Sequence, residues 1–248
     1  MIDDLQLEIR RNRRKNTATI TVFRAGRIVV SVPTHFTNHN IRELIARKRP
    51  WINKKVKQLA SLPPPSPEVQ FINDEGFLFL GEDRRLKITY DGFVGAFSTE
   101  QQIVVSVPAG LAAADQARAV RKELAAWYAN QALTTLNDRV EYFAQHFKQT
   151  LQAAPSRVGV RYYKSRWGVC KPNGEIVFNW CLIMAPLSVI DYVVVHELCH
   201  LRVPNHSRAF WRLVASILPD YKESKRWLRR VDHKKCLAPF GSSRASMT

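Results

Sequence analysis

The sequence predicts an α+β protein with a strand-rich N-terminal region that also contains helices. Short segments of alternating apolar and polar residues, separated by turn residues, recur up to residue 108 and again after residue 157. A segment without Gly or Pro has helical spacing over Ala112–Phe147. These patterns divide the chain into a strand and helix region at 1–62, a second strand region with a long helix at 69–150, a third region at 151–237, and a flexible tail at 238–248.

The first region is expected to form three strands and a helix. Alternation predicts strands over Leu5–Arg10, Ala18–Phe23 and Ile28–Pro33. Helical spacing then predicts a helix over Ile41–Leu59, with Asn38 as its N-cap. Pro50 falls inside this helix and is expected to kink or divide it.

A Pro-rich stretch at 63–67 marks the first boundary and is typical of a stiff extended connector. The strands predicted after it are Phe77–Leu80, Arg84–Tyr90, Gly95–Ser98 and Ile103–Pro108. The last strand, Ile-Val-Val-Ser-Val-Pro, repeats the sequence of Ile28–Pro33 about 75 residues earlier. The repeat indicates a duplicated strand-and-helix unit, with chance similarity as the alternative.

The third region is expected to place a hairpin beside three helices. Its predicted strands are Val158–Tyr163, Arg166–Cys170 and Glu175–Trp180, and its predicted helices are Leu187–Leu201, Ser207–Leu218 and Lys222–His233. Asn173-Gly174 is a hairpin turn signal between the last two strands. The long helix at Ala112–Phe147 is expected to pack beneath the 187–201 helix.

The 187–201 helix carries the pattern His-Glu-x-x-His. Residues four apart lie on one face of a helix, so His196 and His200 can direct two imidazoles at one metal ion. Glu197 is rotated off that face and can reach a water molecule on the metal. This pattern is typical of zinc hydrolases. The alternative, ordinary helix histidines, is disfavoured because three of the seven His fall within residues 196–206.

His206 is the candidate third ligand. Pro204 ends the helix, and a turn there can return His206 to the same ion. Three protein ligands leave one position for water, which is the pattern of a catalytic zinc site with one Zn²⁺ per chain. The spacing matches the metzincin motif, but Val203 stands where metzincins have Gly and no Met-turn follows, which argues against a metzincin.

Composition favours a globular protein with one large or two small domains, because 248 residues can bury a core. No run approaches the ~20 apolar residues that span a membrane, and residues 1–4 do not begin a signal peptide. A cytoplasmic protein without membrane contact is therefore expected. The four Cys form no Cys-x-x-Cys pair, which excludes the usual cysteine zinc knuckle.

The net charge of +17 favours acidic partners, and nucleic acid is one candidate. Basic residues gather in three clusters, at 10–15, at 47–57 and at 222–235. The alternative is that these clusters are solvated faces that keep the protein soluble.

The segment 163–228 resembles the YgjP-like zinc metallopeptidases, which are distantly related to SprT-like proteases. The motifs that carry the resemblance are Ser-Arg-Trp-Gly-Val-Cys at 165–170, Gly-Glu-Ile-Val-Phe-Asn-Trp at 174–180, the helix at 189–201, and Asn205-His206-Ser207 with Phe210-Trp211. The resemblance implies a minimal zincin-like metallopeptidase core with a β-hairpin beside the active-site helix. It also implies His196, His200 and His206 as zinc ligands and Glu197 as the catalytic acid/base.

The predicted reaction is hydrolysis of peptide bonds in a peptide or protein substrate by a zinc-bound water that Glu197 activates. The candidates for substrate contact are Trp167, Asn179 and Arg202, although Trp167 also suits a core position. The candidate oxyanion donors are Arg202, Asn205 and Tyr192. Asp191 could hold a ligand histidine or serve as a helix N-terminal charge.

Two other functions also fit the sequence. One is a nucleic-acid-associated protein whose zinc site is structural or cleaves proteins bound to nucleic acid. The other is a zinc hydrolase that acts on a different bond. The sequence leaves the oligomeric state open.

Overall fold

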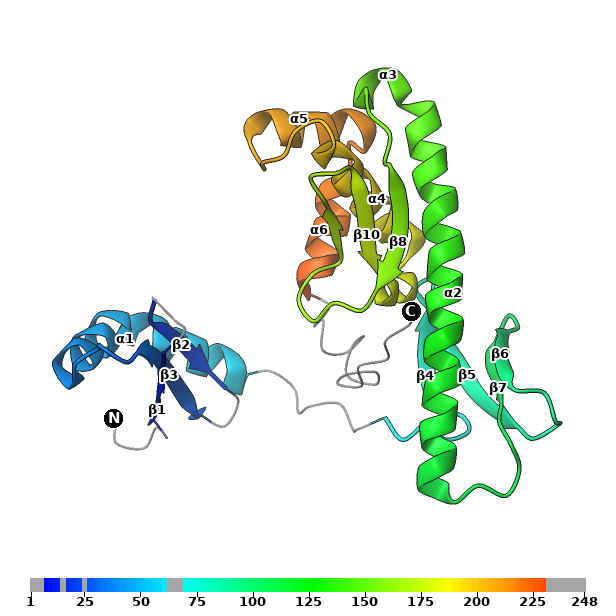
Figure 1. Cartoon of the computed structure of the whole chain (residues 1–248), viewed down its shortest axis with the longest axis horizontal. Coiled ribbons are helices and arrows are strands. Elements are labelled where there is room, and N and C mark those ends of the chain that lie inside the picture. Colours follow the sequence, from blue (N-terminus) through cyan, green and yellow to red (C-terminus); the bar gives the residue numbers. More distant parts are fainter. Residues whose placement is uncertain (1–6, 14–16, 24–25, 62–68, 231–248) are drawn as a thin grey trace. The chain divides into compact units, whose positions relative to one another are not determined.

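The computed structural model describes residues 7–13, 17–23, 26–61 and 69–230 and divides the chain into two compact units, Met1–Ser66 and Pro67–Thr248 (Figure 1). The proposed connector at 63–67 and tail at 238–248 lie outside the described residues. Strands and helices are present in both units, which confirms the α+β class. No helix in the described part of the chain is both long and apolar enough to cross a membrane.

The first unit is a three-stranded sheet followed by one helix. Its elements are β1 (Leu7–Asn12), β2 (Thr19–Val22), β3 (Ile28–Pro33) and α1 (Asn38–Ala60). Apolar residues of β3 and α1 form a small core: Ile28, Val30, Val32, Ile41 and Ile52. Burial of these side chains fixes which face of α1 meets the sheet.

Two details of α1 differ from the sequence prediction. The N-cap is Thr37 and not Asn38, because the Thr37 side chain accepts from the Asn40 backbone N–H while Asn40 Oδ1 accepts from the Thr37 backbone N–H. This reciprocal pair is a capping box. The helix also continues through Pro50 to residue 60 as one element, so Pro50 does not divide it.

The second unit begins with a four-stranded sheet and a long helix. Its first elements are β4 (Gly76–Phe79), β5 (Glu82–Thr89), β6 (Gly95–Ser98), β7 (Gln102–Ser106), α2 (Ala113–His146) and α3 (Lys148–Leu151). The helix α2 runs along β6 and β7 at its start and along a second sheet and helix further on (Figure 1). It therefore joins the two halves of this unit through one core.

The rest of the second unit holds the predicted hairpin and helices. Its elements are β8 (Arg157–Arg161), β9 (Gly168–Cys170), β10 (Glu175–Asn179), the 3₁₀ helix η2 (Trp180–Met184), α4 (Leu187–His200), α5 (Arg208–Ile217) and α6 (Tyr221–Arg230). β9 and β10 are antiparallel, which confirms the hairpin, and α2 packs on α4 as predicted. The regions expected at 69–150 and 151–237 share one hydrophobic core.

Three stretches of the chain share one topology. In the sheets β1-β3-β2 and β8-β10-β9, and in the strands β5-β7-β6 of the four-stranded sheet β4-β5-β7-β6, the last strand in sequence lies between the other two. It is parallel to the first of them and antiparallel to the second. The helices α1, α2 and α4 follow the central strands. The repeated sequence at 28–33 and 103–108 includes the central strand in both copies, as a duplication would require. The third copy has no matching sequence repeat.

The turn between β4 and β5 fixes the start of α4. Leu80 and Gly81 donate their backbone N–H groups to Ile183 and Met184 of η2, at 2.8 and 3.2 Å. Gly81 has φ of 87°, and a Cβ there would lie 2.9 Å from Pro186 Cγ. Pro186 is the N-cap residue of α4. The four-stranded sheet of the second unit thus positions the helix that carries His196 and His200.

Candidate metal centre

The helix α4 places His196 and His200 one turn apart near its C-terminal end. Most of α4 is buried, and its apolar residues are held on several sides by the core. After the helix, the chain turns over residues 201–206, where Val203 donates its backbone N–H to Cys199 at 2.9 Å. Asn205 Oδ1 accepts from the Ser207 backbone N–H, and Ser207 then caps α5. This turn brings His206 back beside the two helix histidines.

The three histidines converge through their Nε2 atoms. The Nε2 atom of His206 lies 3.0 Å from that of His196 and 3.1 Å from that of His200. The Nε2 atoms of His196 and His200 are 3.3 Å apart. A tetrahedral ion with zinc–nitrogen bonds of about 2.0–2.1 Å separates its ligand nitrogens by about 3.3 Å. Among the described residues, this is the one His, Cys, Asp or Glu cluster that could hold a metal ion. The donor set and spacing therefore fit zinc.

The environment keeps the helix histidines neutral. His200 Nδ1 lies 3.1 Å from the Val203 carbonyl oxygen, so Nδ1 donates the proton and Nε2 carries the lone pair. Burial, followed by the charges of His200, His206 and Lys225, lowers the pKa of His196 to about 3. Burial also lowers the pKa of His200. Neutral imidazoles are the form that binds a metal ion.

Glu197 lies against the edge strand β9. Its side chain is buried, and the Cys170 backbone N–H donates to its carboxylate. Burial raises the pKa of Glu197 to about 7, although the Cys170 hydrogen bond and the charge of Arg166 oppose that rise. A carboxyl group with this pKa can accept and return a proton near neutral pH.

Two aromatic rings of α5, those of Phe210 and Trp211, pack against the histidines of the metal centre. The Phe210 ring centroid lies 4.9 Å from those of His196 and His206 and 4.5 Å from that of His200. The Trp211 ring stacks on His206 at 5.7 Å. These contacts fix the imidazole orientations, a role that the sequence pattern alone did not assign to Phe210 and Trp211.

The sequence model of the YgjP-like metallopeptidase domain matches residues 16–231. The chain belongs to the YgjP-like metallopeptidase family. Family membership makes the protein a metallopeptidase and implies a bound metal ion, typically zinc. A comparison with curated proteins gave no match. Among solved structures, the metallopeptidase zymogen abylysin of Pyrococcus abyssi is 27% identical over 37% of this chain and 94% of its own, with a TM-score of 0.33.

Two of the candidate substrate residues are buried in the YgjP-like chain. Trp167 is 8% exposed, and Asn179 is fully buried. The Asn179 Nδ2 atom donates to the carbonyl oxygens of Tyr163 and Arg166, at 2.8 and 3.1 Å, and Oδ1 accepts from the Cys181 backbone N–H. Asn179 thus holds the loop before β9 in place, and its buried position does not fit the expected contact with substrate.

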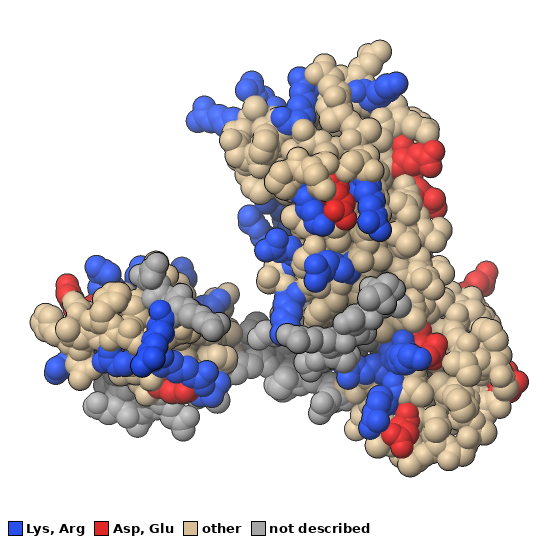
Figure 2. All heavy atoms as spheres, in the orientation of Figure 1, with Lys and Arg blue, Asp and Glu red and all other residues tan. Residues whose placement is uncertain are grey.

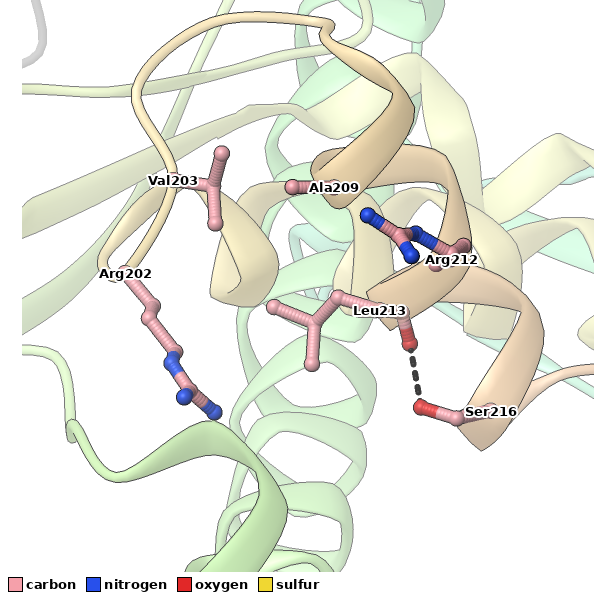
Figure 3. Close-up of a pocket in the computed structure, with 6 residues that line it drawn as sticks. All are labelled: Arg202, Val203, Ala209, Arg212, Leu213 and Ser216. Carbon is pink, nitrogen blue, oxygen red and sulfur yellow. Dashed lines mark hydrogen bonds between the residues drawn. The ribbon is translucent and has the colours of Figure 1, made fainter.

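The third candidate, Arg202, is directed away from the histidines of this YgjP-like centre. Its Nη1 atom donates to the Thr150 carbonyl oxygen at the end of α3, 2.6 Å away. Figure 3 shows its guanidinium extending towards that helix. Arg202 lines a hollow of about 340 Å³ whose other lining residues are Val203, Ala209, Arg212, Leu213 and Ser216. The expectation that Arg202 contacts substrate or an oxyanion does not fit this direction.

Asp191 departs from its expected role as partner of a ligand histidine, whereas Tyr192 does lie beside one. Both Asp191 oxygens bind Arg139 of α2, with Nε–Oδ1 at 2.6 Å and Nη2–Oδ2 at 2.9 Å. Asp191 therefore joins two helices of the YgjP-like core and does not hold a ligand histidine. Tyr192 packs its ring 5.9 Å from that of His196, and burial raises the pKa of Tyr192 to about 12. Its hydroxyl is therefore protonated at neutral pH.

Proposed function

We propose that this metallopeptidase is a zinc-dependent enzyme that hydrolyses peptide bonds, with Glu197 as its general base. The observation that carries the proposal is the convergence of three histidine Nε2 atoms beside a buried carboxyl group. His196, His200 and His206 would hold one zinc ion. Bound zinc supplies Lewis acidity, which acidifies water and polarises a carbonyl group.

Glu197 is the group that would move protons. Its carboxylate would accept a proton from the attacking water and later deliver that proton to the leaving amine. The Cys170 backbone hydrogen bond holds the carboxylate in one orientation against β9. Burial keeps water away from this carboxyl group, so its proton exchange would be directed to the bound water and the substrate.

The strand β9 is suited to bind an extended peptide. It lies at the edge of the sheet β8-β10-β9. The Trp167 carbonyl oxygen accepts from the backbone N–H of Asn179, and the Lys171 backbone N–H donates to the carbonyl oxygen of Glu175. Because backbone groups of successive residues in a strand face opposite sides, those of Gly168 and Cys170 point away from β10. The Cys170 N–H is used by Glu197, and the remaining outward groups can pair with a substrate strand. Such pairing would bring a peptide past Glu197.

Metal content and cleavage of unstructured peptides test this proposal together. The full-length protein should contain about one zinc per chain by mass spectrometry, and His206→Ala should weaken or remove it. Glu197→Gln should keep its zinc and lose peptide cleavage by at least about a hundredfold. Zinc retention with wild-type cleavage rates in Glu197→Gln would contradict the proposed role of Glu197.

A second candidate activity, nucleic-acid binding, is favoured by the charge of the first unit. Residues 1–66 carry 14 Lys and Arg against four Asp and Glu, which supplies +10 of the net +17. Figure 2 shows Lys and Arg over the visible face of this unit with few acidic groups. None of the Lys and Arg of α1 forms an ion pair with another described residue.

One face of α1 combines these charges with an exposed aromatic ring. Arg47, Lys48, Trp51, Lys54 and Lys55 are spaced so that they lie on one side of the helix. Trp51 is 46% exposed. Basic side chains that flank an aromatic ring can hold phosphates while the ring stacks on a base. This face would bind single-stranded nucleic acid without sequence preference.

Fluorescence anisotropy with a labelled single-stranded oligonucleotide tests this second candidate. Binding should fall steeply as salt rises, and Lys54→Gln with Lys55→Gln should weaken it more than Lys87→Gln on β5. Equal effects of the two changes, or no binding at low salt, would remove the candidate and leave the peptidase proposal unaffected.

A further inference from the structure

The last helix of the described chain has one strongly basic face. Lys222 of α6 lies three and four residues before Lys225 and Arg226, and Arg229 lies four and three residues after them, so all four share one side of the helix. The one acidic residue of α6, Glu223, lies elsewhere around the helix. No ion pair joins these cations to an acid among the described residues. The charge of this face is thus available to a ligand.

Lys225 brings this charge to the metal centre. Its Nζ atom lies 3.5 Å from the centroid of the Trp211 ring. That ring lies 5.7 Å from His206 and 5.9 Å from His196. Burial, followed by the charge of Arg229, lowers the pKa of Lys225. The ammonium group therefore lies within electrostatic reach of the histidines.

The position of Lys225 is fixed by packing of α6 on α4 and α5. Tyr221 stacks on Trp211 at 5.5 Å and on Tyr192 at 6.1 Å. Ser224 Oγ donates to the Ser188 carbonyl oxygen at the start of α4, 3.1 Å away. A cation held in this way loses little conformational freedom when it binds a ligand, which favours specific recognition.

Negative groups near the metal centre do not neutralise Lys225. Glu197 faces β9 on another side of α4, where it accepts the Cys170 hydrogen bond. Asp191 is paired with Arg139. The Trp211 ring covers one side of the ammonium group and offers only its π face. The donors of Nζ that point away from the ring would gain a charge-assisted hydrogen bond from an incoming carboxylate.

We propose that Lys225, supported by the basic face of α6, forms a subsite for a carboxylate of the peptide substrate, so that the enzyme selects acidic peptides. The inference rests on the proposed peptidase function. The carboxylate could be an Asp or Glu side chain or the C-terminal carboxylate of the peptide. A basic peptide would be disfavoured, because its cations would approach those of α6.

Peptide binding to full-length, zinc-loaded Glu197→Gln tests the subsite without turnover. Labelled alanine-rich peptides that carry one Glu at successive positions would be compared by anisotropy with matched Gln peptides, each with a free or an amidated C-terminus. Two results are expected outcomes of the proposal. Either at least one Glu peptide binds about tenfold more tightly than its matched Gln peptide, or each peptide with a free C-terminus binds more tightly than the same peptide with an amidated C-terminus. The first result identifies a side-chain carboxylate and the second a C-terminal one.

Substitution at Lys225 then assigns the preference to this residue. In the same background, Lys225→Met keeps an unbranched chain over Trp211 and should abolish the preference, while Lys225→Arg should keep most of it. Lys87→Met on β5, an exposed lysine of another sheet, is the matched control and should keep the full preference. A Lys225→Met preference equal to that of the control would overturn the proposal.

Two further results are distinguishable from these. In one result, a single-stranded oligonucleotide competes with the Glu peptide, and Lys225→Met weakens oligonucleotide binding as much as it weakens peptide binding. The basic face of α6 would then bind polyanions in general, and the peptide subsite would be overturned. If wild-type enzyme cleaves Glu and Gln peptides at equal kcat/KM, the subsite is overturned while the peptidase function stands. Peptide binding with the expected preference but no cleavage by the wild-type enzyme would support the subsite and contradict the proposed reaction.

Discussion

Gly168 of β9 and Glu197 of α4 are in such close contact that no side chain fits between them. A Cβ atom at residue 168 would lie 2.8 Å from both Cγ and Oε1 of Glu197. Real Cβ atoms essentially never show a contact below 3.0 Å, so one of the two elements would have to shift. The glycine thus sets how closely the edge strand approaches the proposed general base.

Gly168→Ala is expected to displace Glu197 and reduce kcat/KM by about a hundredfold, the effect of a displacement of about 1 Å in a catalytic group. His196 and His200 lie on another face of α4 and His206 lies in the turn that follows the helix, so zinc content should be unchanged. Peptide cleavage assays and metal analysis of the same preparation measure both quantities.

Gly159→Ala on β8 is the matched control, because a Cβ there meets nothing within 4 Å. This variant should keep wild-type cleavage. Similar activity of the two alanine variants would show that the contact between residues 168 and 197 does not position the carboxylate.

The pKa of Glu197 predicts how the stability of the metal-free protein changes with pH. Burial raises this pKa from 4.5 to about 7, so the folded state holds a proton that the unfolded state has already released. The stability that protonation provides is present below pH 4.5 and is lost as pH rises through about 7. The difference corresponds to about 3 kcal/mol of unfolding free energy.

Urea unfolding of chelator-treated wild type and Glu197→Gln at pH 4.5 and pH 8 measures this effect. Gln cannot ionise, so the unfolding free energy of the variant should rise by about 3 kcal/mol relative to that of wild type between the two pH values. All other groups titrate in the same way in both proteins. Addition of zinc should shrink the difference, because a nearby cation stabilises the carboxylate. Parallel pH profiles in the metal-free state would contradict the raised pKa.

The convergence of the histidines could be predicted from sequence because it depends on local geometry. A four-residue interval on a helix places His196 and His200 together, and Pro204 requires a turn that returns His206. Strand and helix positions followed from alternation and spacing in the same way. The order of strands did not, because β3, β7 and β10 each pair with a strand that is distant in sequence.

Contacts between distant elements account for the residues that the sequence did not place. Asn179 was a candidate for substrate contact, yet its side chain is fully buried. Arg202 was expected at the reaction centre, but α3 offers its guanidinium a carbonyl oxygen. The role of Gly168 depends on how closely β9 meets α4, and no local pattern encodes that distance.

Asn179 is expected to stabilise the loop before β9. Asn179→Ala would leave the Tyr163 and Arg166 carbonyl oxygens and the Cys181 N–H without their side-chain partner in a buried setting, at a cost of about 2–4 kcal/mol. Thermal unfolding should show a lower Tm, and peptide cleavage should fall because the loop leads directly to β9. Asn130→Ala on the exposed face of α2 should leave both quantities near wild type.

Removal of one partner of the Arg139–Asp191 pair is expected to lower the unfolding free energy, whereas replacement of both partners by apolar residues is expected to change it little. Its two side chains are 23% and 16% exposed, so an isolated Asp191 carboxylate would be poorly solvated. Arg139→Met should therefore lower the unfolding free energy by about 2 kcal/mol at pH 7. The double variant Arg139→Met, Asp191→Leu removes the unpaired charge and should recover most of that loss.

Acid conditions separate charge from packing in this experiment. Burial raises the pKa of Asp191, so its protonation at low pH should remove most of the penalty of Arg139→Met, and the penalty should return as pH rises. Arg118→Met on α2 breaks the exposed Arg118–Asp115 pair, whose side chains are 78% and 54% exposed, and should change stability little at either pH. A penalty for Arg139→Met that is the same at both pH values would assign the loss to the contacts that Arg139 makes with Tyr142 and Phe143, and not to the charge of Asp191.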